Sequence, residues 1–408
     1  MIRDAPLAPW PIARPELLGP AGEKLDLLRS HPAFRAAAAF PETNWANTEC
    51  ITLGGHSFRY NYQRFDLRVT APPVYPALGP SELTFYTCSG MAAITAVVAS
   101  LNRLAQSGIA FWSITDAYFE TQHLVRHYAD RLNVHVAARF SDLAAEAGDA
   151  FVVVHIDSIC AQAPDELWDL LTDRVLLALF DTTCYSRADA RIEETVRRLD
   201  ARGIPVVMVR SHLKLDTLGL ETGRLGSVHL RVPVRCGVFS RQVFQAIAHL
   251  VPDAIRVFGI GPLIDRFLIV ADDDELLNLS AMRADRIKEN SRGLADELQR
   301  AEPDIAVRRY HHGMFLTIHR NDWIAAEPVR KIVADIEALC VQAGLYVAQA
   351  TSFGFDFIAL TDVMDVATNR FCLRLAPSDE PLDRVLSIVP ALMRVVSNSS
   401  PLTRTAPF

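Results

Sequence analysis

The stretch LTFYTCSGMAAITAVVASLNRLAQSGIAFWSI, residues 83–114, contains a β-rich run, a Ser-Gly turn, a helical run of small residues and a second β-rich run. Residues 83–86 and 109–114 have the composition of strands, and residues 91–106 have that of a helix. The same alternation of short strands and helices continues to about residue 232. Such alternation predicts an α/β layer fold with a mostly parallel sheet.

The remaining elements are predicted from the same patterns. Further strands are expected over 134–137, 150–156, 175–181 and 205–209, and further helices over 120–131, 142–147, 164–170 and 189–201. After residue 252 the pattern is α+β, with helices over 274–302, 328–343 and 381–396, a hairpin-like stretch over 306–319, and strands over 345–351 and 369–375. The predicted domains are an N-terminal arm with one helix near 21–31, a large domain and a smaller C-terminal domain, over 1–80, 81–252 and 253–408.

Composition narrows the class of protein. The chain has 408 residues, of which 50% are hydrophobic and 22% charged, as in globular proteins. The net charge of −7 comes from mixed acids and bases, which argues against a nucleic-acid-binding surface. The longest apolar run, near 91–101, is about half the length that crosses a bilayer. We therefore expect a soluble protein that binds neither nucleic acid nor membrane.

The seven cysteines are far apart and never spaced Cys-x-x-Cys, so neither a disulfide framework nor a metal site is expected. The first residues contain no apolar signal core. Together these features favour a cytoplasmic protein.

In open α/β sheets, ligands bind where strands end and helices begin. At the first such junction, Ser89 and Gly90 make a tight turn before a helix that starts at Met91. Free amides at a helix start favour a phosphate. The alternative is an ordinary helix cap.

Two further junctions carry an aromatic side chain and a carboxylate. Tyr118 could lie flat against a planar ring, or be an ordinary core or rim aromatic. Asp181 ends the apolar run 175–180, and a buried carboxylate there is costly unless it is paired. A protonated pyridine nitrogen would be such a partner. The alternative is a helix cap.

The two cations that stand out are Lys214 and Arg374. Lys214 follows the strand 205–209 in the segment Ser211-His212-Leu213-Lys214, where burial would make an amine a nucleophile for an aldehyde. An exposed loop lysine is the alternative. Arg374 lies inside an apolar strand and could bind a substrate carboxylate, or form a structural ion pair.

With these candidate residues in this order along the chain and in these positions relative to the predicted strands, the chain resembles the fold-type I pyridoxal-phosphate enzymes. The resemblance is closest to the cystathionine gamma-synthase-like family of cysteine and methionine metabolism. The resemblance runs from about residue 60 to 395. The matching segments are Ser89-Gly90-Met91-Ala92-Ala93 at the phosphate, Tyr118 on the ring, Asp181-Thr182-Thr183-Cys184 at the pyridine nitrogen, Ser211-His212-Leu213-Lys214 with the Schiff-base lysine, Tyr62-Gln63-Arg64 toward a neighbouring subunit's phosphate, Ser352-Phe353-Gly354, and Arg374 at the substrate carboxylate.

The resemblance implies a mostly parallel sheet of the seven-stranded type with a smaller α+β domain, bound pyridoxal 5'-phosphate, and a homodimer or dimer of dimers. It implies that Ser89, Gly90, Met91, Ser211, Tyr62 and Arg64 bind the cofactor together with Tyr118, Asp181 and Lys214, and that Arg374, Ser352 and Tyr62 bind the substrate. Lys214, Asp181 and Tyr118 would take part in catalysis.

The chain departs from the family pattern at several positions. Where the family has Glu-Ser-Pro-x-Asn-Pro, this chain has Asp157-Ser158-Ile159-Cys160-Ala161-Gln162, without the asparagine that binds the cofactor phenol. The threonine before the lysine is Leu213, and Phe119-Glu120 replaces a glycine pair. An extra helix is expected between Asp181 and Lys214. These departures favour a specialised member, in secondary metabolism.

The implied reaction is γ- or β-elimination or replacement on an amino acid, through carbanion and quinonoid intermediates. Candidate substrates are a homoserine ester, a cysteine-like amino acid or one of the S-adenosylmethionine type. Two alternatives stay open. One is an aminotransferase on the same scaffold, and the other is a binding or regulatory protein that has lost catalysis.

Overall fold

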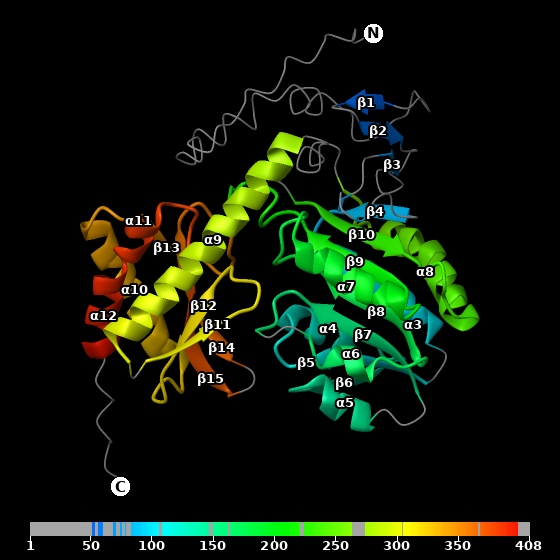
Figure 1. Ribbon diagram of the computed structural model, residues 1–408, viewed down its shortest axis with the longest axis horizontal. Helices are drawn as coiled ribbons and strands as arrows, with labels where there is room; N and C mark the ends of the chain where they lie inside the picture. Colours follow the sequence, from blue (N-terminus) through cyan, green and yellow to red (C-terminus); the bar gives the residue numbers. More distant parts are fainter. Residues whose placement is uncertain are drawn as a thin grey trace. The chain divides into compact units, whose positions relative to one another are not determined.

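The computed structural model describes residues 51–53, 56–59, 68–70, 74–75, 78, 83–105, 108–146, 150–161, 164–220, 224–262, 274–303, 305–365 and 368–398 (Figure 1). The chain divides into two compact units. The first comprises Met1–Ile159 and Ala163–Ala281, and the second Cys160–Gln162 and Met282–Phe408. The border near residue 281 falls inside helix α9 (Asp274–Ala301). The three domains expected from the sequence stay a prediction.

The first unit is built on a seven-stranded sheet in the order β4-β10-β9-β8-β7-β5-β6. Its strands are β4 (Leu83–Thr87), β5 (Ile109–Ile114), β6 (Asn133–Ala137), β7 (Phe151–Asp157), β8 (Val175–Asp181), β9 (Val206–Ser211) and β10 (Gly226–Arg231). Strand β10 runs antiparallel to both neighbours, and the other strands run parallel to one another. The predicted α/β fold with a mostly parallel sheet is confirmed.

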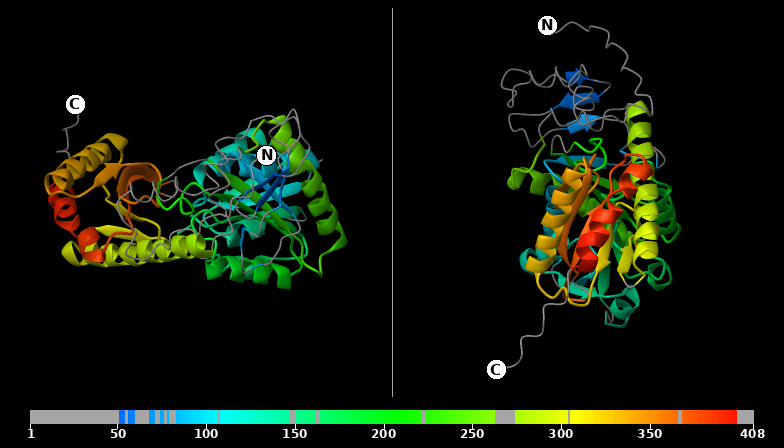
Figure 2. Two further views of the ribbon diagram at one scale, coloured as in Figure 1. Left: turned by 90° about the horizontal axis from the view of Figure 1, so that it is seen from above. Right: turned by 90° about the vertical axis from the view of Figure 1, so that its left-hand side faces the viewer.

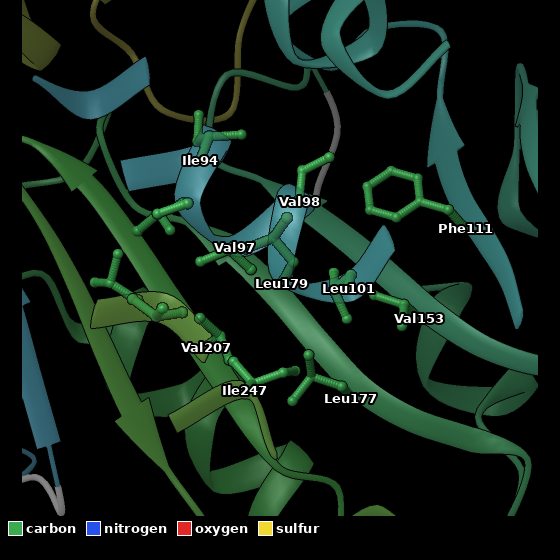
Figure 3. Close-up of a cluster of buried hydrophobic side chains, with 14 of the residues drawn as sticks. Ile94, Val97, Val98, Leu101, Phe111, Val153, Leu177, Leu179, Val207 and Ile247 are labelled. Carbon is green, nitrogen blue, oxygen red and sulfur yellow. The ribbon is translucent and has the colours of Figure 1, made fainter. Parts of the chain in front are cut away.

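Helices cover both faces of this sheet. One face packs against α3 (Gly90–Leu104), α4 (Phe119–Tyr128) and α8 (Val238–Val257), and the other against α5 (Phe140–Glu146), α6 (Leu167–Leu170) and α7 (Ala190–Ala201). Figure 3 shows the first of these cores, where α3 side chains such as Val97 and Leu101 meet Leu177 and Leu179 of β8. Because both faces are buried, β8 is apolar along nearly its whole length.

Strand β10 and helix α8 of the first unit were not predicted. Strand β10 contains Ser227 and His229, and these polar residues hide it from a search for apolar runs. Helix α8 contains Pro252, and because a proline usually marks the end of a helix, the sequence pattern predicts the start of a new region there. In the structure the helix continues past this proline to Val257.

The second unit contains a five-stranded sheet in the order β11-β12-β15-β14-β13. Its strands are β11 (Ala306–Arg309), β12 (Leu316–His319), β13 (Val347–Gln349), β14 (Ile358–Asp365) and β15 (Arg370–Ala376). Helices α9, α10 (Ala326–Gln342), α11 (Leu382–Leu386) and α12 (Val389–Asn398) share one apolar core with the sheet (Figure 2). The expected antiparallel pair over 306–319 is confirmed as β11 and β12, whereas β14 was missed and the last helix is split in two.

A small antiparallel sheet, β1 (Ile51–Leu53), β2 (His56–Arg59) and β3 (Arg68–Thr70), lies within the segment expected to be an extended arm. The predicted helix near 21–31 and the residues Tyr62 and Arg64 lie outside the described residues. Within the part of the chain that the structure describes, every helix is too short or too polar to traverse a lipid bilayer.

Candidate active site

The start of helix α3 follows directly after strand β4. Ser89 caps the helix, since its Oγ accepts a hydrogen bond from the Ala92 amide at 3.1 Å. The Thr87 hydroxyl donates to the Ser89 carbonyl at 2.8 Å and holds the turn. The first amides of an α-helix have no acceptor within the helix, and its dipole favours an anion there. This junction therefore provides neutral donors that suit an anionic group.

Gly90 allows the end of strand β9 to touch the start of α3. A Cβ built on Gly90 would lie 2.6 Å from Ser211 Cβ and 3.0 Å from Ser211 Cα, too close for any side chain. On the neighbouring strand, a Cβ on Gly226 would lie 2.1 Å from the Ser89 carbonyl oxygen. The close packing brings Ser211 beside the helix start. Met91, in the first turn, is half-buried.

Two carboxyl groups lie next to each other at the ends of β7 and β8. Asp157 and Asp181 are register partners in the two parallel strands, and both are buried. The Asp181 Oδ1 accepts a hydrogen bond from the Thr183 amide at 2.8 Å. Burial, helped by the charge of Asp157, raises the pKa of Asp181 to about 6. Asp181 thus ends a buried strand beside a second acid.

Asp157 links this pair to Tyr118. Its Oδ2 accepts a hydrogen bond from the Tyr118 amide at 2.9 Å, and its Oδ1 one from the Ile159 amide at 3.0 Å. Burial raises the pKa of Asp157 to about 6. The half-buried Tyr118 immediately precedes α4, and its hydroxyl donates to Glu120 Oε2 at 2.8 Å.

His155 is a functional candidate that the sequence reasoning missed. It is buried in β7 two residues before Asp157, and its Nδ1 is hydrogen-bonded to Ser113 Oγ at 3.0 Å. Its Nε2 lies 3.8 Å from Asp157 Oδ2 and has no hydrogen-bond partner within the described residues. Burial lowers the pKa of His155 to about 4. A histidine inside the otherwise apolar run 151–156 was the available signal.

Lys214 lies at the same edge of the sheet, three residues after the end of β9. It is half-buried, and the Ser211 amide at the start of its segment donates to Thr183 Oγ1 at 3.0 Å. Burial raises the pKa of the Cys184 thiol, and the charge of Lys214 acts in the opposite direction. The Lys214 amine is therefore within electrostatic reach of the segment that follows Asp181.

A buried ionic cluster holds the Lys214 segment and was also missed. Arg210 donates from Nε and Nη2 to both carboxylate oxygens of Asp216, at 2.8 and 2.7 Å. His212 Nδ1 is hydrogen-bonded to Asp216 Oδ2 at 2.7 Å, and its Nε2 to Ser227 Oγ at 2.8 Å. Burial would raise the pKa of Asp216, but Arg210 and His212 hold it well below its usual range. The link from His212 to Asp216 closes a loop around Lys214.

Arg374 and Ser352 lie together in the second unit. Arg374 is half-buried in β15, its Nη2 donates to the Ser352 carbonyl at 3.5 Å, and its guanidinium lies 5.3 Å from the Phe315 ring centroid. A guanidinium on an aromatic face keeps its charge and can still bind a carboxylate. The structure thus joins the two predicted substrate-binding residues, while Tyr62 and Arg64 lie outside the described residues.

The residues of the first unit form a continuous series of contacts from Ser89 to Tyr118. It runs through Gly90, Ser211, Thr183, Asp181 and Asp157. At one end are neutral donors suited to a phosphate, and further along are a buried carboxyl suited to a basic ring nitrogen and a lysine amine suited to an aldehyde. These groups fit pyridoxal phosphate.

No family model and no curated protein matches the sequence. Many solved structures match the fold. One is a Campylobacter jejuni protein described as an O-acetylhomoserine (thiol)-lyase with a pyridoxyl-lysine-5'-monophosphate. It has a TM-score of 0.55 and 15% sequence identity, over 77% of this chain and 82% of that chain. At this identity the likeness concerns the fold, and the expected fold-type I architecture is confirmed.

Proposed function

We propose that this chain is a pyridoxal-phosphate-dependent enzyme that acts on an amino acid, with the cofactor attached to Lys214. The observation that carries the proposal is the series of contacts from Ser89 and Gly90 through Ser211 to Asp181, with Lys214 on the adjoining segment. The pyridoxyl-lysine in the Campylobacter jejuni protein of the same fold supports it.

Each group has a role that follows from its chemistry. The helix start at Ser89 and Gly90, together with Ser211, would hold the phosphate through neutral hydrogen-bond donors. Asp181 would hold a proton on the ring nitrogen, and Tyr118 would contact the ring face. The bound cofactor supplies an electron sink for the substrate α-carbon. Arg374 would bind the substrate carboxylate in two-pronged fashion, supported by Ser352.

The finer proposal is γ- or β-elimination or replacement, on a homoserine ester, a cysteine-like substrate or an S-adenosylmethionine-type substrate. The Lys214 amine would be the base that takes the substrate α-proton. Removal of a second proton, from the β-carbon, would then allow a γ-substituent to leave. The O-acetylhomoserine (thiol)-lyase description of the structural neighbour favours this class over the others.

Borohydride reduction of the cofactor-loaded protein, followed by peptide mapping, tests the assignment. We expect a pyridoxyl group on Lys214, and we expect Lys214→Ala to lose both the yellow colour and turnover. Lys288→Ala is a matched control because this lysine is also half-buried and pairs with Asp285 within α9. A modified lysine at any other position would show that Lys214 is not the attachment site.

Incubation with a panel of amino acids tests the reaction class. Release of an eliminated or replaced β- or γ-group supports the proposal. Formation of a keto acid without loss of a side-chain substituent would indicate transamination instead of elimination or replacement. Cofactor binding at Lys214 without any turnover would favour a binding or regulatory protein.

A further inference from the structure

One face of the seven-stranded sheet changes from apolar to polar toward the ends of its parallel strands. Side chains alternate between the two faces of a strand, so residues two apart share a face. Along β7, Val153 is followed on this face by His155 and Asp157, and along β8, Leu177 and Leu179 are followed by Asp181. His155, Asp157 and Asp181 therefore form a polar layer at the end of this face, and Asp181 is also part of the candidate cofactor site.

One ring nitrogen of His155 is hydrogen-bonded to Ser113, and the other lies near Asp157. The His155 Nδ1 is hydrogen-bonded to Ser113 Oγ at 3.0 Å. The Nε2 atom lies 3.8 Å from Asp157 Oδ2 and has no hydrogen-bond partner in the described part of the chain. If the Ser113 hydroxyl donates to Nδ1, then Nε2 carries the proton and faces the carboxylate favourably. In the other tautomer a lone pair would face the carboxylate, which is favourable only if Asp157 is protonated.

Among the described residues, few charged groups act on this layer. His155 experiences the charge of Asp181, Asp181 experiences those of Asp157 and His155, and the neighbouring Cys184 thiol experiences both acids and the Lys214 amine. The Asp157 carboxylate also accepts the amides of Tyr118 and Ile159. Burial disfavours the ionised form of Asp157, and the neutral N–H groups of Tyr118 and Ile159 favour it.

We propose that His155, held by Ser113, is a positioning residue that keeps Asp157 ionised, so that Asp157 and Asp181 together hold the proton on the cofactor ring nitrogen. The inference rests on the proposed function. Two adjacent carboxylates stabilise a pyridinium more than one does, because each adds an attractive charge in a buried site. Without His155, the ionised form of Asp157 should be less favoured, and its contribution to holding the ring proton should be smaller.

The readout is the protonation state of the ring nitrogen, followed by 15N NMR of ring-labelled pyridoxal phosphate bound to the protein over about pH 6 to 10. We expect His155→Phe to lose the ring proton at a pH about one unit or more below the parent. Asp157→Asn should give a similar shift. The double variant should shift little further, because His155 acts through Asp157.

His229→Phe is a matched control. His229 is also buried, its Nδ1 is hydrogen-bonded to Thr84 Oγ1 at 3.0 Å, and its Nε2 also lacks a partner within the described residues. Among the described residues, the charge that acts on His229 is that of Arg231 and not that of a carboxylate. Its replacement should leave the ring-nitrogen signal unchanged. An equal shift in both variants would indicate a general effect of removing a buried imidazole and would overturn the proposal.

Ser113→Ala provides a second route if His155→Phe does not fold. It keeps the imidazole but removes the hydroxyl that selects the tautomer, and a smaller shift in the same direction is expected. An unchanged midpoint in both His155→Phe and Ser113→Ala would overturn the role of His155 while the proposed function stands. If the parent itself carries no reducible cofactor on Lys214, the proposed function fails and this inference fails with it.

Discussion

At the scale of single residues, Asp157 and Asp181 are both buried, although an ionised carboxylate is better solvated in water. Burial raises the pKa of Asp157 and of Asp181 to about 6. A carboxyl whose folded pKa is raised stabilises the fold at low pH, and this contribution is lost as the pH rises through the folded pKa. The contribution of His155 to stability has the opposite pH dependence. Burial lowers the pKa of His155 to about 4, so this contribution is lost as the pH falls toward that value. At neutral pH the cofactor-free fold therefore carries two costly charges, as functional sites often do.

Asp157→Asn is accordingly expected to stabilise the cofactor-free protein at neutral pH. The gain should be about 1–2 kcal/mol above pH ~7, since one buried charge is removed, although the asparagine oxygen can accept only one of the two backbone amides that Asp157 accepts. Below about pH 4 the parent carboxyl is itself neutral, so the difference should vanish. Urea unfolding at about pH 5 and pH 8 measures this. The exposed Asp335→Asn is the control, and a gain that does not change with pH would contradict the account.

At the scale of elements, the segment after β9 is held in place by a buried ion pair as well as by its backbone conformation. Arg210 and Asp216 form a bidentate pair with both side chains fully buried, and the Arg210 Nη1 also donates to the carbonyls of Thr182 and Tyr185. Farther along, Leu218 has a φ of 56° and Gly219 one of 88°, so the chain leaves the loop in a left-handed conformation. The Lys214 loop is thus fixed at both ends.

Asp216→Asn is expected to lower the free energy of unfolding by about 3–5 kcal/mol, because Arg210 would remain buried without a counter-charge. Thermal or urea unfolding of the cofactor-free protein measures the loss. Glu194→Gln is the matched control, since Glu194 pairs with Arg197 and Arg198 on the exposed side of α7 and its loss should change stability little. Unfolding of Asp216→Asn at the parent's denaturant concentration would show that the buried pair is dispensable.

At the scale of the whole molecule, the candidate residues are distributed over the chain. The contact series and Lys214 belong to the first unit, Arg374 and Ser352 to the second, and Tyr62 and Arg64 lie outside the described residues. The groups at the start of α3 and at Ser211 are neutral donors, whereas a phosphate carries close to two negative charges. The family resemblance offers Arg64 of a neighbouring copy as the missing cation.

We therefore expect a homodimer or dimer of dimers in which Tyr62 and Arg64 complete the neighbour's site. Arg64→Ala and Lys214→Ala proteins should each be impaired alone. After subunit exchange, a mixed dimer contains one site with both residues intact, so up to about a quarter to a half of parental activity should return. Two Arg64→Ala preparations mixed in the same way provide the control. A fully active monomer in sedimentation would rule out the shared site.

The elements that were visible in the sequence are those with a strong local pattern. The apolar runs of β5 and β8, the small-residue helix α3 and the long α9 were predicted near their observed bounds. The Ser89-Gly90 turn, Asp181 and Lys214 stood out for a similar reason, because a polar or glycine residue directly after a buried strand is a local signal. Their joint role in cofactor binding remains a proposal.

The tertiary structure decided which of these residues meet. Strand register brings Asp157 beside Asp181, and it brings Ser113 close to His155 although 42 residues separate them in the chain. The Arg210–Asp216–His212 cluster depends in the same way on how the chain turns after β9. A local pattern reports which face of an element is buried. The partner of a buried polar group depends on strand order and register, which arise only when distant segments pack together.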